Sequence, residues 1–165
     1  MAASLNFESL VALYYEPLYQ FAFSLTRAEA EACDLTQQTF CVWAQKGHQL
    51  HDASKVKTWL FTTLHREFLG ARRKQNRFPH LEIESVEAEL AVELPVAFSA
   101  LDGAQILAAL AQLEEIYQAP VALFYLQDHS YNEIAEILDV PLGTVKSRLS
   151  RGLEKLHCGL TAENL

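Results

Sequence analysis

Hydrophobic residues recur at every third or fourth position in several segments of the chain, the spacing typical of helices that bury one face. Residues 5–26 form the first such segment. Pro17 lacks the amide hydrogen that a helix interior uses, so we expect it to bend or split this helix. The apolar face of the segment is expected to consist of Leu10, Leu13, Tyr14, Leu18, Phe21 and Leu25.

A second helix is predicted from Glu29 to Lys46, with Gly47 as its C-cap. Leu35, Thr39 and Val42 follow one another at spacings of four and three, so they should face inward. The outer row of this helix is uncharged to acidic and contains Asp34, Gln37, Gln38, Cys41 and Gln45.

A third helix should follow a polar loop at residues 48–54, where Asp52 or Ser54 can cap it, and should run to about Gln75. Its core side is expected to contain Val56, Leu60, Leu64 and Ala71. Its other sides interleave aromatic and basic residues: Phe61, His65, Phe68 and Arg72, with Arg66, Arg73 and Lys74 beside them. The rings could stack on the bases of an opened DNA strand while the cations hold phosphates. Alternatively, the two phenylalanines are ordinary core and the cations a solvated face, which this helix taken alone favours.

Residues 78–102 contain two prolines, five glutamates and no lysine or arginine, which predicts an acidic linker. Helical spacing resumes over residues 101–112, and Pro120 suits the first turn of a short helix that ends near Gln127. The pattern therefore predicts an all-α chain with two small helical domains, one of three helices at residues 1–77 and one of four at residues 103–165.

The segment from Ser130 to Leu156 has the pattern of a helix-turn-helix. Ser130 and Glu133 form a capping box, so a helix should begin at Tyr131, and the sequence Asp139-Val140-Pro141 should end it. His129 is interpreted as a packing or turn residue. The second helix should bury a stripe of leucine and valine: Leu142, Val145, Leu149, Leu153 and Leu156.

The opposite face of the second helix carries only hydroxyls and cations: Thr144, Ser147, Arg148, Arg151 and Lys155, with Lys146 on its flank. Such a face suits the major groove of DNA, where phosphates attract the cations and base edges accept or donate hydrogen bonds. A solvated amphipathic hairpin is the plainer alternative.

The net charge of −8 is a poor match to a simple DNA-binding protein, but the charge is unevenly distributed. Residues 55–77 carry seven cations and one acid, residues 140–165 carry four and two, and the rest is acidic. We expect the acidic linker to compete with DNA for the basic helix. The chain has no apolar run near 18 residues and no signal-like start, so a soluble cytoplasmic protein is expected.

The segments DLTQQTFCVWAQKGHQL and VKTWLF, followed by SYNEIAEILDVPLGTVKSRLSRGLEKL, resemble bacterial extracytoplasmic-function (ECF) sigma factors of the sigma-70 family. The resemblance implies a region 2 domain at residues 1–77 and a region 4 domain at residues 103–165. It also implies binding to the largest subunits of core RNA polymerase and to promoter DNA, with an anti-sigma factor as a further partner. No enzyme activity, cofactor, metal or membrane insertion is expected.

The resemblance also assigns roles to particular residues. It assigns polymerase docking to Asp34, Gln37, Gln38, Phe40 and Trp43. It assigns recognition and melting of the −10 element to Lys55, Lys57, Trp59, Phe61, His65, Arg66, Arg72, Arg73 and Lys74. It assigns the −35 element to Thr144, Lys146, Ser147, Arg148, Arg151 and Lys155. Asp128 and Asp139 stand at turn positions where glycine is common, and aspartate can adopt the left-handed conformation there.

Three other classes of protein compete with this interpretation. A helix-turn-helix regulator with an N-terminal sensor domain would also contain residues 130–156. A metal or redox sensor could use Cys33, Cys41, His48 and His51, although their spacing matches no compact ligand motif. An enzyme is disfavoured because no nucleophile triad or glycine-rich phosphate loop is visible.

Overall fold

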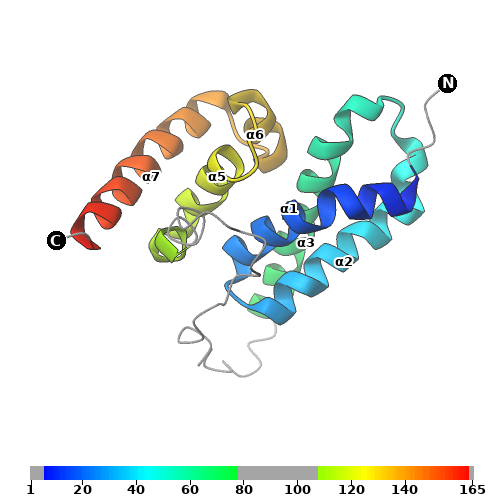
Figure 1. Ribbon diagram of the computed structural model, residues 1–165, viewed down its shortest axis with the longest axis horizontal. Helices are drawn as coiled ribbons and strands as arrows, with labels where there is room; N and C mark the ends of the chain where they lie inside the picture. The colour runs from blue at the N-terminus through cyan, green and yellow to red at the C-terminus, as the bar shows by residue number, and fades with distance from the viewer. Residues whose placement is uncertain (1–5, 78–107, 164–165) are drawn as a thin grey trace.

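The computed structural model describes residues 6–77 and 108–163. Within these ranges the regular elements are α-helices and 3-10 turns, and there is no β-strand (Figure 1). The N-terminal half contains α1 (Phe7–Thr26), α2 (Glu29–Lys46), the 3-10 turns η1 (Gly47–Gln49) and η2 (Ala53–Lys55), and α3 (Val56–Arg77). The C-terminal half contains a helical stretch at residues 108–112, then α5 (Glu115–Tyr125), α6 (Tyr131–Leu138) and α7 (Leu142–Glu163). The all-α prediction is confirmed, and the predicted linker at residues 78–102 lies outside the described residues.

The N-terminal half is held together by apolar side chains from all three of its α-helices. α1 and α2 lie side by side, and α3 packs on both (Figure 1). Leu18, Phe21, Leu60 and Leu64 have no exposed surface, and Leu35 is buried beside them. Burial of a large apolar side chain stabilises a fold by about 1.5–3 kcal/mol, so these contacts outweigh the small differences in helix propensity.

Pro17 does not split the first helix, because α1 runs unbroken through it. A proline removes one backbone hydrogen bond from a helix, and the buried contacts of Leu18, Phe21 and Leu25 on the following turns hold the segment in place. Three residues predicted to be buried are exposed instead: Leu13, Ala71 and Leu142. Each belongs to an apolar stripe that is wider or longer than the neighbouring helices cover.

Gly47 is the C-cap of α2, as predicted, but its backbone is right-handed, with φ −60°. Its role is steric. A Cβ at this position would lie 2.6 Å from two ring carbons of Trp43, far inside a normal contact. Glycine therefore lets the Trp43 ring lie against the chain, where it also meets Trp59 edge-on with ring centroids 5.1 Å apart.

The helix α5 begins one turn earlier than predicted, so Pro120 lies in its interior rather than in its first turn. The side-chain amide of Gln118 donates hydrogen bonds to the carbonyls of Leu110 at 3.1 Å and Leu113 at 2.9 Å. Gln118 is buried, and these two bonds satisfy carbonyls where the helical stretch 108–112 ends.

The helix-turn-helix forms with the predicted boundaries at its first helix. The Ser130 hydroxyl accepts a hydrogen bond from the amide of Glu133 at 3.2 Å, and Asp139 ends α6 with φ 54°. Asp128 is also left-handed, with φ 52°. The second half of the predicted capping box is wrong, because the Glu133 carboxylate contacts His129 rather than the amide of Ser130.

The two halves of the molecule pack against each other through α1 with α5 and through α3 with α6 (Figure 1). The Arg27 guanidinium donates to the Leu113 carbonyl at 3.2 Å, and the Gln127 amide donates to the Gln20 side chain at 2.9 Å. The described chain is therefore a closed arrangement, in which the C-terminal half covers part of α1 and α3.

The close approach of α5 and α7 depends on Gly152. A Cβ there would lie 2.7 Å from Val121 Cγ2 and 3.2 Å from Tyr117 Cβ. We expect Gly152→Ala to lower the free energy of unfolding by about 1–3 kcal/mol, measured by urea denaturation. The matched control is Gly70→Ala on α3, where no atom lies within 4 Å, which should raise stability by about 0.5–1 kcal/mol. Equal effects of the two changes would contradict the packing of α5 against α7.

Candidate nucleic-acid interface

The outer face of α7 presents a cluster of hydroxyls and cations to solvent. Lys146, Ser147, Arg151 and Lys155 are exposed, and Thr144 and Arg148 are half-buried. The buried side of the same helix contains Val145, Leu149 and Leu156, which fix the orientation of the exposed face. The six predicted −35 residues therefore lie on accessible surface of one helix.

Lys155 has a partner that the sequence pattern did not indicate. Its ammonium group lies 2.7 Å from Glu114 Oε1 and 5.1 Å from the centre of the Tyr117 ring. The hydrogen bond that Lys155 donates to the Glu114 carboxylate raises the pKa of Lys155 above its ordinary value. Glu114 directly precedes α5, so an acid from another element lies beside a face that has no acid of its own in the sequence.

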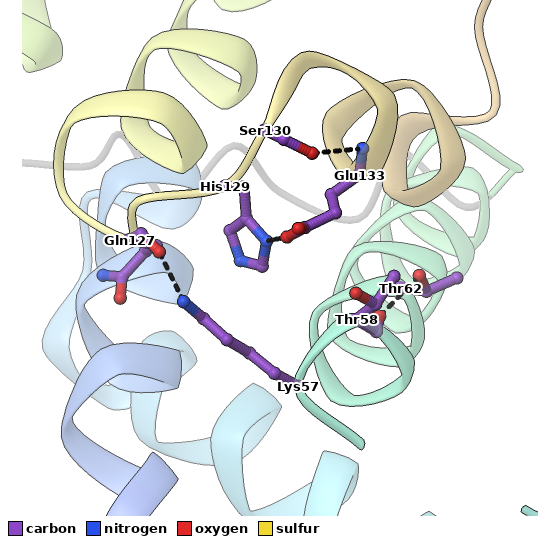
Figure 2. A network of polar contacts seen from close by, with 7 residues as sticks. All are labelled: Lys57, Thr58, Thr62, Gln127, His129, Ser130 and Glu133. Atoms are coloured by element: carbon purple, nitrogen blue, oxygen red, sulfur yellow. Dashed lines mark hydrogen bonds and ion pairs between the residues drawn. The ribbon is translucent and has the colours of Figure 1, made fainter. Parts of the chain in front are cut away.

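The cations of α3 and of the 3-10 turn η2 that precedes it fall into two groups. Lys55, Arg66, Arg73 and Lys74 are exposed. Lys57 and Arg72 contact the C-terminal half instead. Lys57 Nζ donates to the backbone carbonyl of Gln127 at 2.6 Å (Figure 2), and Arg72 forms an ion pair with Glu115.

The aromatic residues predicted to stack on DNA bases differ in exposure. Phe61 has no exposed surface and lies against Phe21 with centroids 5.6 Å apart, so in this arrangement it is a core residue. Phe68 is buried as well. Trp59 is half-buried and remains the accessible ring of the set. In this closed arrangement both phenylalanine rings are therefore core, as the alternative to base stacking expected, and their role at the −10 element stays a prediction.

His65 is half-buried on α3, and burial lowers its pKa to about 4. Its ring is therefore neutral at pH 7 and adds no positive charge for a phosphate. Among the nine predicted −10 residues, the structure leaves six exposed or half-buried without a hydrogen bond or ion pair to the described residues of the other half: Lys55, Trp59, His65, Arg66, Arg73 and Lys74.

The five predicted docking residues on α2 also divide by exposure. Asp34, Gln37 and Gln38 are exposed, and Asp34 and Gln38 line a groove between α2 and α3. Phe40 is only 5% exposed and Trp43 only 9% exposed. These two side chains therefore pack in the core and position α2 rather than face outward. Burial follows from their aromatic contacts, with Tyr15 for Phe40 and with Trp59 for Trp43.

Residues 6–77 and 108–163 contain no group of three side chains arranged to hold a metal ion. In the same ranges, no helix has the length and hydrophobicity needed to cross a membrane. Cys33 and Cys41, considered above for a sensor site, form no disulfide.

Two family models match the chain. Residues 10–78 match the model described as Sigma-70 region 2, and residues 103–156 match the model described as Sigma-70, region 4. The ECF RNA polymerase sigma factor SigL of Mycobacterium tuberculosis is 31% identical, with 96% of this chain and 93% of that protein covered. SigE of Mycolicibacterium smegmatis is also 31% identical over 94% of this chain, but this covers only 62% of the longer SigE protein.

Solved structures of similar shape support the same comparison. The sigma factor RpoE of Bartonella quintana, in complex with the anti-sigma factor NepR, superposes with a TM-score of 0.77 at 29% identity. The alignment covers 94% of this chain and 97% of that one. CnrH, in complex with the cytosolic domain of CnrY, superposes with a TM-score of 0.65 at 24% identity and supports the fold alone.

The burial of Phe61 can be tested directly. Phe61→Ala should lower the free energy of unfolding by about 3–5 kcal/mol, because a fully buried ring leaves a cavity when it is removed. Phe7→Ala, at a ring that is 45% exposed, should change it by less than about 1 kcal/mol. Chemical denaturation followed by circular dichroism measures both. A loss at Phe61 no larger than that at Phe7 would show that Phe61 is not in the core.

Proposed function

The chain belongs to the ECF sigma factors of the sigma-70 family, and from this premise we propose how its residues divide the work of promoter recognition. As a sigma factor it binds core RNA polymerase and promoter DNA and directs promoter-specific transcription initiation. Sigma factors are specificity subunits and not enzymes. Its place of action is the cytoplasm, where the polymerase transcribes the chromosome.

The C-terminal half, residues 103–165, reads the −35 element through α7. The observation that carries this assignment is the exposed row of hydroxyls and cations on the second helix of a helix-turn-helix, the helix that enters the major groove in this motif. Arg148 and Arg151 are suited to bidentate contacts with guanine, while Lys146 and Lys155 suit phosphates. Lys155 must first exchange Glu114 for the DNA backbone.

The N-terminal half, residues 1–77, docks on the polymerase through the exposed part of α2 and contacts the −10 element through α3. Asp34, Gln37 and Gln38 supply the docking surface, since they are exposed on one helix. Trp59 supplies an accessible ring for a base, and the cations of α3 supply phosphate contacts.

The closed arrangement makes the −10 surface conditional. Lys57 and Arg72 are bound by the C-terminal half, so both become available only after the halves separate. This is a different masking element from the acidic linker expected from sequence. Polymerase docking would supply the free energy for separation, and an anti-sigma factor would act by stabilising a conformation that polymerase does not accept.

The docking surface is tested by reversing its chemistry without touching the core. We expect Asp34→Arg or Gln38→Arg to weaken binding to core polymerase about 10- to 30-fold, as loss of a hot-spot contact of about 2 kcal/mol does. Circular dichroism should stay unchanged, because both side chains are exposed. The control is Glu16→Arg, an exposed acid on α1. Competition with wild-type protein for core enzyme measures the effect. If Glu16→Arg weakens binding as much as the α2 variants do, the assignment of α2 to the polymerase interface is wrong.

The −35 reader is tested with Arg148→Ala and Arg151→Ala on a panel of −35 variants. One change should remove about 1–3 kcal/mol of discrimination at a single base pair, because a bidentate arginine contact is lost. If the other arginine contacts phosphate, its removal weakens all sequences alike and lowers the salt slope by about one. Gln112→Ala, exposed in the helical stretch 108–112 and outside the helix-turn-helix, is the control. No effect of either arginine on DNA binding or transcription by the holoenzyme would show that the face is wrongly assigned.

A further inference from the structure

His129 is a buried histidine at the boundary between the two halves. It lies in the turn between α5 and α6 and is only 2% exposed (Figure 2). Its ring meets the Phe61 ring of α3 edge-to-face, with centroids 4.7 Å apart at 73°. Its backbone amide donates to the Leu123 carbonyl at 3.0 Å. A titratable ring therefore fills the apolar contact between the C-terminal half and α3.

The hydrogen bonds of His129 define its protonation state. Nδ1 lies 2.8 Å from Glu133 Oε2, and an ionised carboxylate can only accept, so Nδ1 carries the hydrogen (Figure 2). Nε2 is buried and has no hydrogen-bond partner among the residues that the structure describes. The neutral ring suits this environment, because its unprotonated nitrogen requires no acceptor.

A proton on Nε2 would create a buried N–H donor and a positive charge with no acceptor beside it. Lys57 of α3 opposes this charge, since its ammonium group is held nearby by the Gln127 carbonyl at 2.6 Å. Asp128 and Glu133 favour the charge from the segment of His129 itself. Burial is the largest influence, and together these groups lower the pKa of His129 below its ordinary value.

His65 is the histidine of α3 itself, one turn beyond Phe61. Its pKa of about 4 keeps its ring neutral above about pH 5. It therefore carries no charge over most of the pH range in which the boundary is tested below.

We propose that His129 is a proton-operated latch between the halves: the neutral ring holds the α5–α6 turn against α3, and protonation of Nε2 separates them. Separation would also break the bond from Lys57 to the Gln127 carbonyl. Acid would thus release a cation for DNA, a consequence that rests on the −10 role proposed above. The separation itself does not depend on that role.

The direction of the pH effect follows from proton binding. In the closed form His129 is neutral. In the open form its ring reaches water and regains the ordinary histidine pKa of about 6.5. The closed form therefore binds fewer protons. Its stability is complete above about pH 6.5 and declines as pH falls below that value, by at most about tenfold per pH unit for one proton.

The test measures conformation rather than transcription, so its failure is distinct from failure of the proposed DNA contacts. Small-angle X-ray scattering of the full chain gives the radius of gyration between about pH 7.5 and about pH 5. We expect the wild type to expand reversibly as pH falls, while His129→Leu, which fills the space with an apolar group that cannot titrate, stays compact. His51→Gln, at an exposed histidine, should expand like the wild type.

Two further measurements complete the design. His65→Gln should also expand like the wild type, because His65 is neutral throughout most of the range. Histidine NMR titration of the wild type should show one ring whose protonation accompanies the expansion, and this signal should be missing in His129→Leu and present in His65→Gln. The wild-type titration by itself does not depend on any variant being folded. Circular dichroism at pH 7.5 checks that each variant is folded, and His129→Phe replaces His129→Leu if that variant is not.

Three results would overturn the latch. The first is a wild type that keeps its radius of gyration throughout the range. The second is expansion of a folded His129→Leu or His129→Phe protein with the wild-type pH dependence. The third is loss of the expansion in His65→Gln but not in His129→Leu.

Discussion

The helix α3 must bury apolar side chains against two sets of neighbours, and this constraint determines most of what the protein presents to its surroundings. Phe61 lies against Phe21 of α1 on one side and His129 on the other. The same helix carries the larger basic island of the chain. A surface suited to DNA and a surface suited to packing therefore share one helix, and covering the second removes part of the first.

Charge contributes to this arrangement without dominating it. The adjacent acids Glu114 and Glu115 pair with Lys155 of α7 and Arg72 of α3, one cation from each predicted DNA surface. All four side chains are substantially exposed, and such pairs contribute only about 0–1 kcal/mol each and weaken with salt. The buried contacts around Phe61 and His129 hold the halves together, and the acids occupy cations that DNA would otherwise attract.

An interface of this kind suits a protein that must change partners. Each half is small, and a small domain buries too little surface to be very stable by itself, so contact between the halves benefits both. The contact nevertheless includes hydrogen bonds to exposed or half-buried groups, such as that of Lys57, which water or phosphate can replace at modest cost. In the proposed function, stability in the free chain and accessibility on the polymerase would require different arrangements of the same helices.

Much of the local structure could be predicted from sequence, because it depends on neighbours within one turn. Spacing of apolar residues predicted α2 at its observed bounds, and the Ser130 cap and the left-handed Asp139 predicted α6. The exposed face of α7 also followed from helical period alone. The start of α5 predicted from Pro120 was wrong, because the buried hydrogen bonds from Gln118 to two carbonyls outweigh the preference of proline for the first turn of a helix.

By itself, the sequence determined the fold class, the helix-turn-helix, the basic islands and the family, since these depend on residue order and spacing. Only the tertiary structure decided which of the named side chains are accessible. Phe61, Phe40 and Trp43 look alike in a sequence whether a neighbouring helix covers them or not, and all three are buried. The contacts of Lys57 with a backbone carbonyl and of His129 with Phe61 join residues about 70 positions apart. No local pattern encodes such a pair, because it forms only when the whole chain has folded and two helices bury a common surface.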